Sequence, residues 1–544
     1  MCVYKSRRFA DRKSLTQLLA LPLGAALSLA GTQASAVSAI ADAAELGRLD
    51  GVLELIQSGT DVNDPETDGT TALLWASYQA YPEMVSALLE AGADPNMANE
   101  FGITPLIQAA RIGDPETTRL LLEAGADASI THPTGETALM AAARSGNIDT
   151  VSLLLDADSD VNAIEILQHQ SALMWASAEG HADIVGALLD AGADPNLQAR
   201  ESELTDRTPR TDFPSGGFTA LMWAARNADE ATAARLIAGD ADLNLTNADG
   251  ATAMMIAVVN DRFDFAKYLL DQGADANDGS LYQAVLMRDA THDWLAKDST
   301  QWRADHPNEL TSLDLVRLYL DAGADPNKPF IGQLHSASMC CDTKENATPL
   351  FRAAVAADVE TLALLIEHGG DVSWSPDAPE GEGGGGFGPR LVGRTPLMVA
   401  MNGGKGVGMA GGPGDIREGL KPPFREEANR EPLDAMRIIL DAGADPDAVT
   451  PDGESALHLA AKDGKLDEIR LLADAGATLD LPNGDGETAL EVVDAMEPRE
   501  PPPTTGAQAG IEQGAQPAEV AVLLRELMGL DPANAQASNA GGAE

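Results

Sequence analysis

The chain is poor in cysteine, in aromatic residues and in cations. It has three cysteines in 544 residues, aromatic side chains make up 4%, and 36 lysines and arginines compare with 85 aspartates and glutamates. The formal charge of −49 opposes binding to nucleic acid or to an anionic membrane surface, because both require a basic footprint. We interpret this charge as keeping a long, exposed chain soluble; attraction of a cationic partner is the alternative.

Long apolar runs are missing beyond residue 36. The first 36 residues combine a basic start, an apolar run over residues 15–31 and the small residues Ala34-Ser35-Ala36, which together are typical of a secretory signal peptide. We expect cleavage near Ala36 and a periplasmic or secreted protein from a bacterium. An uncleaved anchor is the alternative, but the run is short for a membrane span, so we expect no stable membrane insertion.

Catalytic and cofactor motifs are missing too. The sequence has no G-K-[ST] loop, H-E-x-x-H, G-x-S-x-G or C-x-x-C, and its eight histidines are scattered. Residues 406–411 match G-x-G-x-x-G but lack the preceding strand and following helix that nucleotide binding requires. We therefore predict no enzymatic activity, no cofactor and no metal site.

What the chain does contain is a repeat. Thr71, Thr104 and Thr137 lie 33 residues apart at the start of similar apolar runs, and a fixed period in this range indicates stacked helical units. A threonine or serine can cap the first helix of each unit, and leucine triplets supply the buried face of the second.

Glycine is placed to end most of the second helices in the left-handed conformation. These glycines are Gly59, Gly92, Gly125, Gly192, Gly273, Gly323, Gly369, Gly443 and Gly476. Asp158 and Asp240 take the same place in two repeats, where we expect an irregular stop.

The best-preserved repeat runs from Gly102-Ile103-Thr104-Pro105-Leu106 to Gly125-Ala126-Asp127. It resembles the ankyrin repeat, whose T-P-L-H-x-A signature and G-A-D tail it matches except that Ile107 replaces the usual histidine. The resemblance covers residues 38–528. It implies an all-α ankyrin-repeat solenoid of about 12 helix-pair units, with short hairpin fingers, several long loop insertions and a concave groove that binds another protein.

The predicted organisation has five parts. They are the signal peptide (1–36), N-terminal repeats (37–275), repeats with long insertions (276–447), C-terminal repeats (448–528, with a Pro/Gly-rich linker at 497–516) and a disordered tail (529–544).

Six insertions break the period. Three fall between repeats, at residues 197–216, 328–346 and 375–393, and three between paired helices, at 289–311, 402–430 and 497–516. Such insertions map to loops and often to a binding face; neutral growth of exposed loops is the alternative. Among the insertions, residues 328–393 are the strongest candidate for a binding role, because two fingers project there from adjacent repeats.

Two sets of side chains recur at fixed repeat positions. Arg111, Arg144 and Arg226 follow the small-residue pair, a place that the ankyrin resemblance assigns to the groove, where a cationic row would bind carboxylates; alternatively, each pairs with a neighbouring acid. Trp75, Trp175 and Trp223 precede that pair. They would form an aromatic binding ladder or, as we prefer, part of the helix packing.

The inserted loops supply the remaining candidates. His335, Trp374, Phe387 and Arg390 are predicted to bind the partner. Cys340 and Cys341 are a candidate disulfide in a compartment that permits one. The pair would form a local loop clasp, join another chain, or bind a soft metal with His335, although two cysteines and one histidine are an incomplete metal set.

We therefore predict a monomeric, non-enzymatic scaffold that binds a partner protein through its groove and fingers. The alternatives are a redox or metal role for the Cys340-Cys341 loop, and a secreted effector or regulator of an exported enzyme. Fold alone does not distinguish them.

Overall fold

The computed structural model describes residues 38–200, 216–289, 308–329, 347–376, 391, 393–401, 431–499 and 514–531. These residues form 24 α-helices, and their only extended pairings are isolated bridges, so the predicted all-α class is confirmed. The chain divides after Ala193 into two compact parts. We call them the N-terminal body (residues 38–193) and the C-terminal body (residues 194–531).

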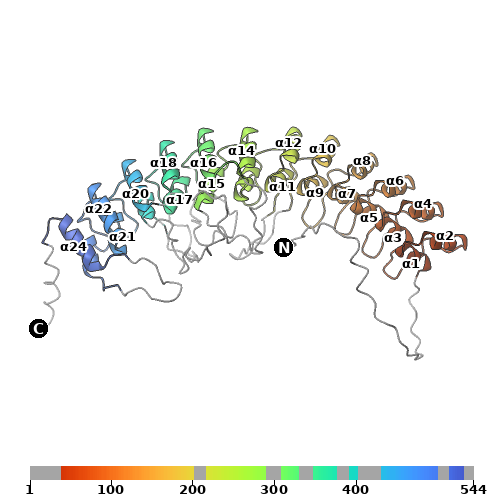
Figure 1. Ribbon diagram of the computed structural model, residues 1–544, viewed down its shortest axis with the longest axis horizontal. Coiled ribbons are helices and arrows are strands. Elements are labelled where there is room, and N and C mark those ends of the chain that lie inside the picture. The colour runs from red at the N-terminus through yellow and green to blue at the C-terminus, as the bar shows by residue number, and fades with distance from the viewer. Residues whose placement is uncertain are drawn as a thin grey trace, which may run out of the picture. The chain divides into compact units, whose positions relative to one another are not determined.

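The N-terminal body contains five helix pairs. Its helices are α1 (Ala39–Glu45), α2 (Leu49–Gln57), α3 (Ala72–Tyr78), α4 (Pro82–Glu90), α5 (Pro105–Ile112), α6 (Pro115–Glu123), α7 (Ala138–Ser145), α8 (Ile148–Asp156), α9 (Ala172–Glu179) and α10 (Ala182–Asp190). The first helices α1, α3, α5, α7 and α9 pack on one another in one layer, and the second helices form the other layer (Figure 1). Each pair therefore buries its apolar face against its neighbours, as a solenoid requires.

The C-terminal body continues the pattern. Its helices are α11 (Ala220–Asn227), α12 (Glu230–Ala238), α13 (Ala253–Val259), α14 (Phe263–Asp271), α15 (Ser280–Asp289), α16 (Ser312–Asp321), α17 (Pro349–Ala356), α18 (Val359–Glu367), α19 (Pro396–Ala400), α20 (Pro432–Asp441), α21 (Ala456–Asp463), α22 (Leu466–Asp474), α23 (Ala489–Asp494) and α24 (Pro517–Leu527). As predicted, three insertions separate paired helices: α15 from α16, α19 from α20 and α23 from α24.

First helices begin as the sequence predicts. Thr71 has extended backbone angles, and its side chain accepts a hydrogen bond from the amide of Leu74. Thr104 does the same for Ile107, followed by Pro105 at the first helical position. The hydroxyl satisfies an amide that has no partner inside the helix, so these two repeats fix the start of their own first helices, whereas Thr395 before α19 makes no such bond.

The nine predicted glycine stops all have positive φ, so that prediction is confirmed. The irregular stops expected at Asp158 and Asp240 are wrong. Both aspartates adopt the same left-handed conformation, with φ of 55° and 64°, and the amide of Asp158 donates to Leu155 as glycine does elsewhere. Aspartate is among the few residues that tolerate this conformation, so the turn keeps its shape.

An asparagine at the end of a repeat ties it to the next. The side-chain amide of Asn96 donates to the carbonyl of Gly125 at 3.1 Å, and its oxygen accepts from the amide of Asp127 at 2.7 Å. Asn63 repeats both bonds one repeat earlier. We call this series the asparagine ladder. Ser129 occupies the next position, and its hydrogen bonds go back to Asp127 of its own repeat, so this rung is missing.

The C-terminal body contains a buried ion pair that sequence patterns do not reveal. Arg288 on α15 donates from Nε to Asp358 at 2.5 Å and from Nη2 to Glu360 at 3.0 Å, and its side chain is 2% exposed. Asp358 also caps α18 by accepting from Thr361. This pair, which we call the arginine latch, joins α15 to the start of α18.

Candidate functional site

Arg111, predicted to face the groove, is held by an acid. Its guanidinium donates to both oxygens of Glu136, from Nε at 3.0 Å and from Nη2 at 2.6 Å. Glu136 directly precedes the Thr137 cap of α7, so the pair crosses from one repeat to the next. A bidentate pair occupies the donors that would otherwise bind a partner's carboxylate.

Arg144 and Arg226 are arranged differently. Arg144 lies 5.7 Å from the ring centre of Trp175 in the next repeat, with Glu179 3.9 Å away. Arg226, in the C-terminal body, lies 5.5 Å from the ring of Trp223 on its own helix. Desolvation lowers the pKa of Arg226, but its surface is largely open and the group stays cationic at neutral pH. Each arginine thus covers a tryptophan through a cation–π contact.

The three recurrent tryptophans are half-buried. Trp175 donates its indole N–H to Gln170 at 3.0 Å, whereas Trp223 packs on Phe218 with ring centres 5.1 Å apart. Trp75 meets Tyr78 edge-on at 5.9 Å. Part of each tryptophan therefore packs between helices, as we preferred, and the rest of the side chain is exposed to solvent.

Of the loop candidates, only Trp374 lies within the described residues. It is half-buried and meets the fully buried Phe351 of α17 edge-on, with ring centres 5.1 Å apart. His335, Phe387, Arg390, Cys340 and Cys341 lie outside the described residues. The grouping of these loop residues with the three arginines into one binding surface therefore stays a prediction.

An apolar ridge on the fingers of the N-terminal body was missed by the sequence analysis. Phe101, Ile166 and Leu167 are 60%, 59% and 62% exposed. The exposed Pro133 stands between them, because Gly102 abuts Pro133 and Gly135 abuts Ile166. We call these four residues the finger ridge. The sequence does carry a signal for this ridge, namely a large apolar residue at the tip of a finger. The preceding finger has Asp68 and Gly69 at its tip instead.

A buried carboxylate shapes the finger that carries Ile166 and Leu167. Glu165 is 5% exposed and accepts hydrogen bonds from the amides of Leu167, Gln168 and Gln170 at 2.7, 2.6 and 3.1 Å. The amide of Ile166 donates to Thr134 of the previous finger at 2.7 Å. These bonds fix the loop backbone in a conformation that keeps the side chains of Ile166 and Leu167 exposed to solvent.

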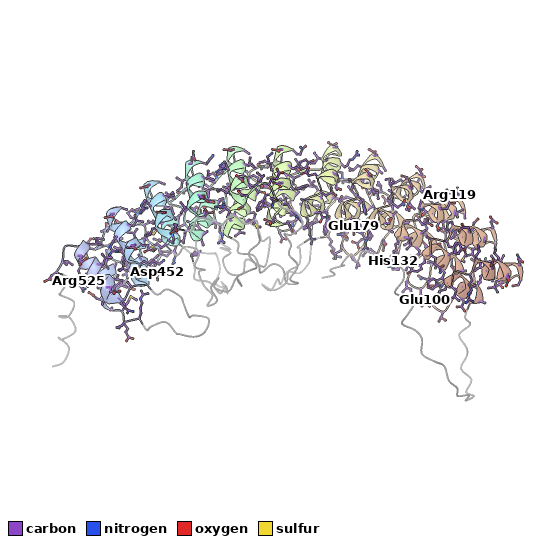
Figure 2. All side chains as sticks on the ribbon, in the orientation of Figure 1. Glu100, Arg119, His132, Glu179, Asp452 and Arg525 are labelled. Atoms are coloured by element: carbon purple, nitrogen blue, oxygen red, sulfur yellow. The ribbon has the colours of Figure 1, made fainter. Side chains whose placement is uncertain are left out.

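Acidic side chains gather beside α1. Asp42 and Glu45 of α1 and Glu66 of the first finger place carboxylate oxygens within 4.8 Å of one another. Burial raises the pKa of Glu66, and the neighbouring carboxylates raise it further. The indole N–H of Trp75 opposes this rise in the pKa of Glu66, although it does not reach hydrogen-bonding geometry. In Figure 2, Glu100 and His132 lie on the finger side of this body, and Arg119 lies on the opposite side.

Replacing Glu66 with glutamine is expected to raise the melting temperature at pH 7. A carboxyl whose pKa is raised by folding favours the folded state less and less as pH rises from its ordinary pKa through the raised one. Glu66→Gln removes that loss. Thermal unfolding followed by circular dichroism would show the difference at pH 7 and its disappearance near about pH 3, where the carboxyl is protonated in both states. An equal difference at both pH values would contradict this.

Comparison with a protein-family model supports the resemblance noted from the sequence. The family model described as ankyrin repeats (3 copies) matches residues 40–132, 106–199, 203–280 and 427–493. A solved structure, the crystal structure of the human ASB11 ankyrin repeat domain, is 26% identical, with a TM-score of 0.36; the match covers 43% of this chain and 96% of that one. No curated protein matches the chain.

None of the described helices is long and apolar enough to cross a membrane. The family model spans more than half of the 544 residues, and paired helices with left-handed stops repeat along the described parts of both bodies. The chain therefore belongs to the ankyrin repeat family.

Proposed function

We propose that the chain is a non-enzymatic scaffold that acts in the periplasm or outside the cell and holds a partner protein against its fingers and first helices. Ankyrin repeats generally mediate protein–protein interaction, and the family is typically non-enzymatic. The leader with its Ala34-Ser35-Ala36 site supports export.

The finger ridge is the observation that carries the proposal. Single exposed apolar side chains are ordinary on protein surfaces, but a contiguous exposed patch indicates an interaction site. Phe101, Pro133, Ile166 and Leu167 are neighbours on successive fingers. The side-chain oxygens of Asn99 and Glu165 accept hydrogen bonds from the loop amides and hold two of these fingers in shape. A preformed apolar ridge lowers the entropy cost of binding.

The test compares partner capture by three forms of the mature protein from Val37 onward. Wild type, F101S/I166S/L167S and the control I148S/V449S/L530S are incubated with periplasmic and secreted extracts, and the bound proteins are identified. The control replaces three exposed apolar residues that are not part of the ridge. One partner held by wild type and control and lost by the ridge variant is expected. Equal capture by all three forms would refute the ridge as the binding surface.

Export has its own readout. The amino-terminal sequence of the protein recovered from cell fractions should begin at or near Val37, and the protein should be absent from the cytoplasm. An intact leader in the cytoplasmic fraction would contradict the proposed location.

A further inference from the structure

The inner surface of the first two repeats combines carboxylates with aromatic rings. Asp42 and Glu45 of α1 meet Glu66 within 4.8 Å, and Trp75 of α3 lies beside Glu66. Tyr78, which is 54% exposed, packs edge-on against Trp75.

Two further features bound this surface, which we call the acidic–aromatic face. The exposed Leu46 follows α1, and the side-chain amide of Gln79 at the end of α3 donates to the carbonyl of Glu45, joining the two helices. Asp68 adds a fourth carboxylate near Glu66. The face therefore presents fixed negative charge next to exposed ring and aliphatic surface.

The folded repeats next to the acidic–aromatic face have almost no cations of their own. Between residues 38 and 110 the only basic side chain is Arg48, which lies in the turn between α1 and α2. The acidic residues over the same range are Asp42, Glu45, Asp50, Glu54, Asp61, Asp64, Glu66, Asp68, Glu83, Glu90, Asp94 and Glu100. From Arg111 onward, by contrast, the groove position carries arginines that meet Glu136 or Trp175. A cation that neutralises the acidic–aromatic face must therefore come from outside residues 38–110.

We propose that the acidic–aromatic face binds a basic segment of the partner protein, with a lysine or arginine of that segment placed among Asp42, Glu45 and Glu66. The cation relieves the repulsion between the carboxylates and lies against the Trp75–Tyr78 pair, because aromatic faces attract cations. A neighbouring apolar residue of the segment covers Leu46. This inference rests on the proposed scaffold function and adds the chemistry of the partner.

Selection from a random linear-peptide library against the full mature chain tests the inference. Enriched peptides are expected to combine lysine or arginine with an aromatic or aliphatic residue. D42N/E45Q/E66Q should weaken their binding about tenfold or more at roughly 0.15 M salt. The control D50N/E54Q/E90Q removes the same charge from exposed positions on α2 and α4 and should weaken binding less than about twofold. Melting curves of both variants check that the repeats remain folded.

Each other outcome overturns the inference in a different way. Equal losses in the two charge variants would mean that the peptides respond only to net charge. Peptides that are insensitive to D42N/E45Q/E66Q but lost by F101S/I166S/L167S would place binding on the finger ridge, which leaves the proposed function intact. Calcium chloride displacing the peptides from wild type would make the three carboxylates a metal site. If no basic peptide is enriched although a natural partner is captured, the inference is rejected and the proposed function stands.

Discussion

Arg288→Met is expected to lower the free energy of unfolding of the C-terminal body by about 3–5 kcal/mol, the range for breaking a buried ion pair from one side. The substitution leaves Asp358 charged and buried without its bidentate partner, whereas methionine fills much of the same space. Urea unfolding monitored by circular dichroism gives the loss, and hydrogen exchange of α15 and α18 locates it.

The matched control is Arg317→Met. Arg317 pairs with Asp314 at 3.5 Å on the exposed side of α16, with half of its side chain open to water, and such pairs contribute about 0–1 kcal/mol. A solenoid can unfold in stages, so a single urea transition need not report on one interface. Hydrogen exchange of α15 and α18 is therefore the decisive measurement. Unchanged protection of α15 and α18 in Arg288→Met would show that the arginine latch does not hold these helices together.

Glu165→Ala is expected to have the largest effect on a finger. Three backbone amides lose a charged acceptor, and hydrogen bonds to charged groups contribute roughly 1.5–3 kcal/mol each when buried; water entering the opened loop recovers part of this. We therefore expect the local opening free energy of the finger to fall by about 2 kcal/mol or more. Amide exchange of residues 165–170 measures it directly.

The same substitution tests whether partner binding requires the fixed conformation of this finger or only its apolar residues. Glu165→Ala leaves Ile166 and Leu167 in the sequence but removes the bonds that fix them, so partner capture should weaken while helices α7 to α10 keep their protection. Glu165→Gln retains one acceptor oxygen and should fall between alanine and wild type. Full capture by Glu165→Ala would mean that the order of this finger is irrelevant to binding.

Features that repeat were the ones that sequence could predict. Threonine caps and glycine stops are local signals, because the hydroxyl or the missing Cβ acts within a few residues. The nine glycine stops are confirmed, whereas among the threonine caps Thr395 makes no capping hydrogen bond to α19. Asp158 and Asp240 show the limit of this reasoning. A rule based on glycine predicted a broken turn, whereas the backbone kept its conformation and the aspartate adapted to it.

Contacts made across repeats were beyond the reach of sequence patterns. Pairing of Arg111 with an acid was the alternative that the sequence left open, but the acid itself, Glu136, lies 25 residues away in the next repeat. The arginine latch joins residues 70 positions apart. Neither partner is marked by spacing or composition in a chain so rich in acids. The finger ridge consists of one or two apolar residues on each of three short fingers, and such isolated residues become a patch only when the fingers stack.

The missing rung at Ser129 affects the cooperativity of unfolding along the N-terminal body. In a stack of repeats, cooperativity depends on how strongly each interface couples neighbours. Asn63 and Asn96 couple the first three repeats through paired bonds, and Ser129 omits them at the next interface. Phe101 and Ile166 of the finger ridge stand on opposite sides of this interface, which the bidentate Arg111–Glu136 ion pair crosses instead. Coupling between the third and fourth repeats therefore depends on charge, and hydrogen exchange is expected to show that added salt loosens this interface more than the two that Asn63 and Asn96 join.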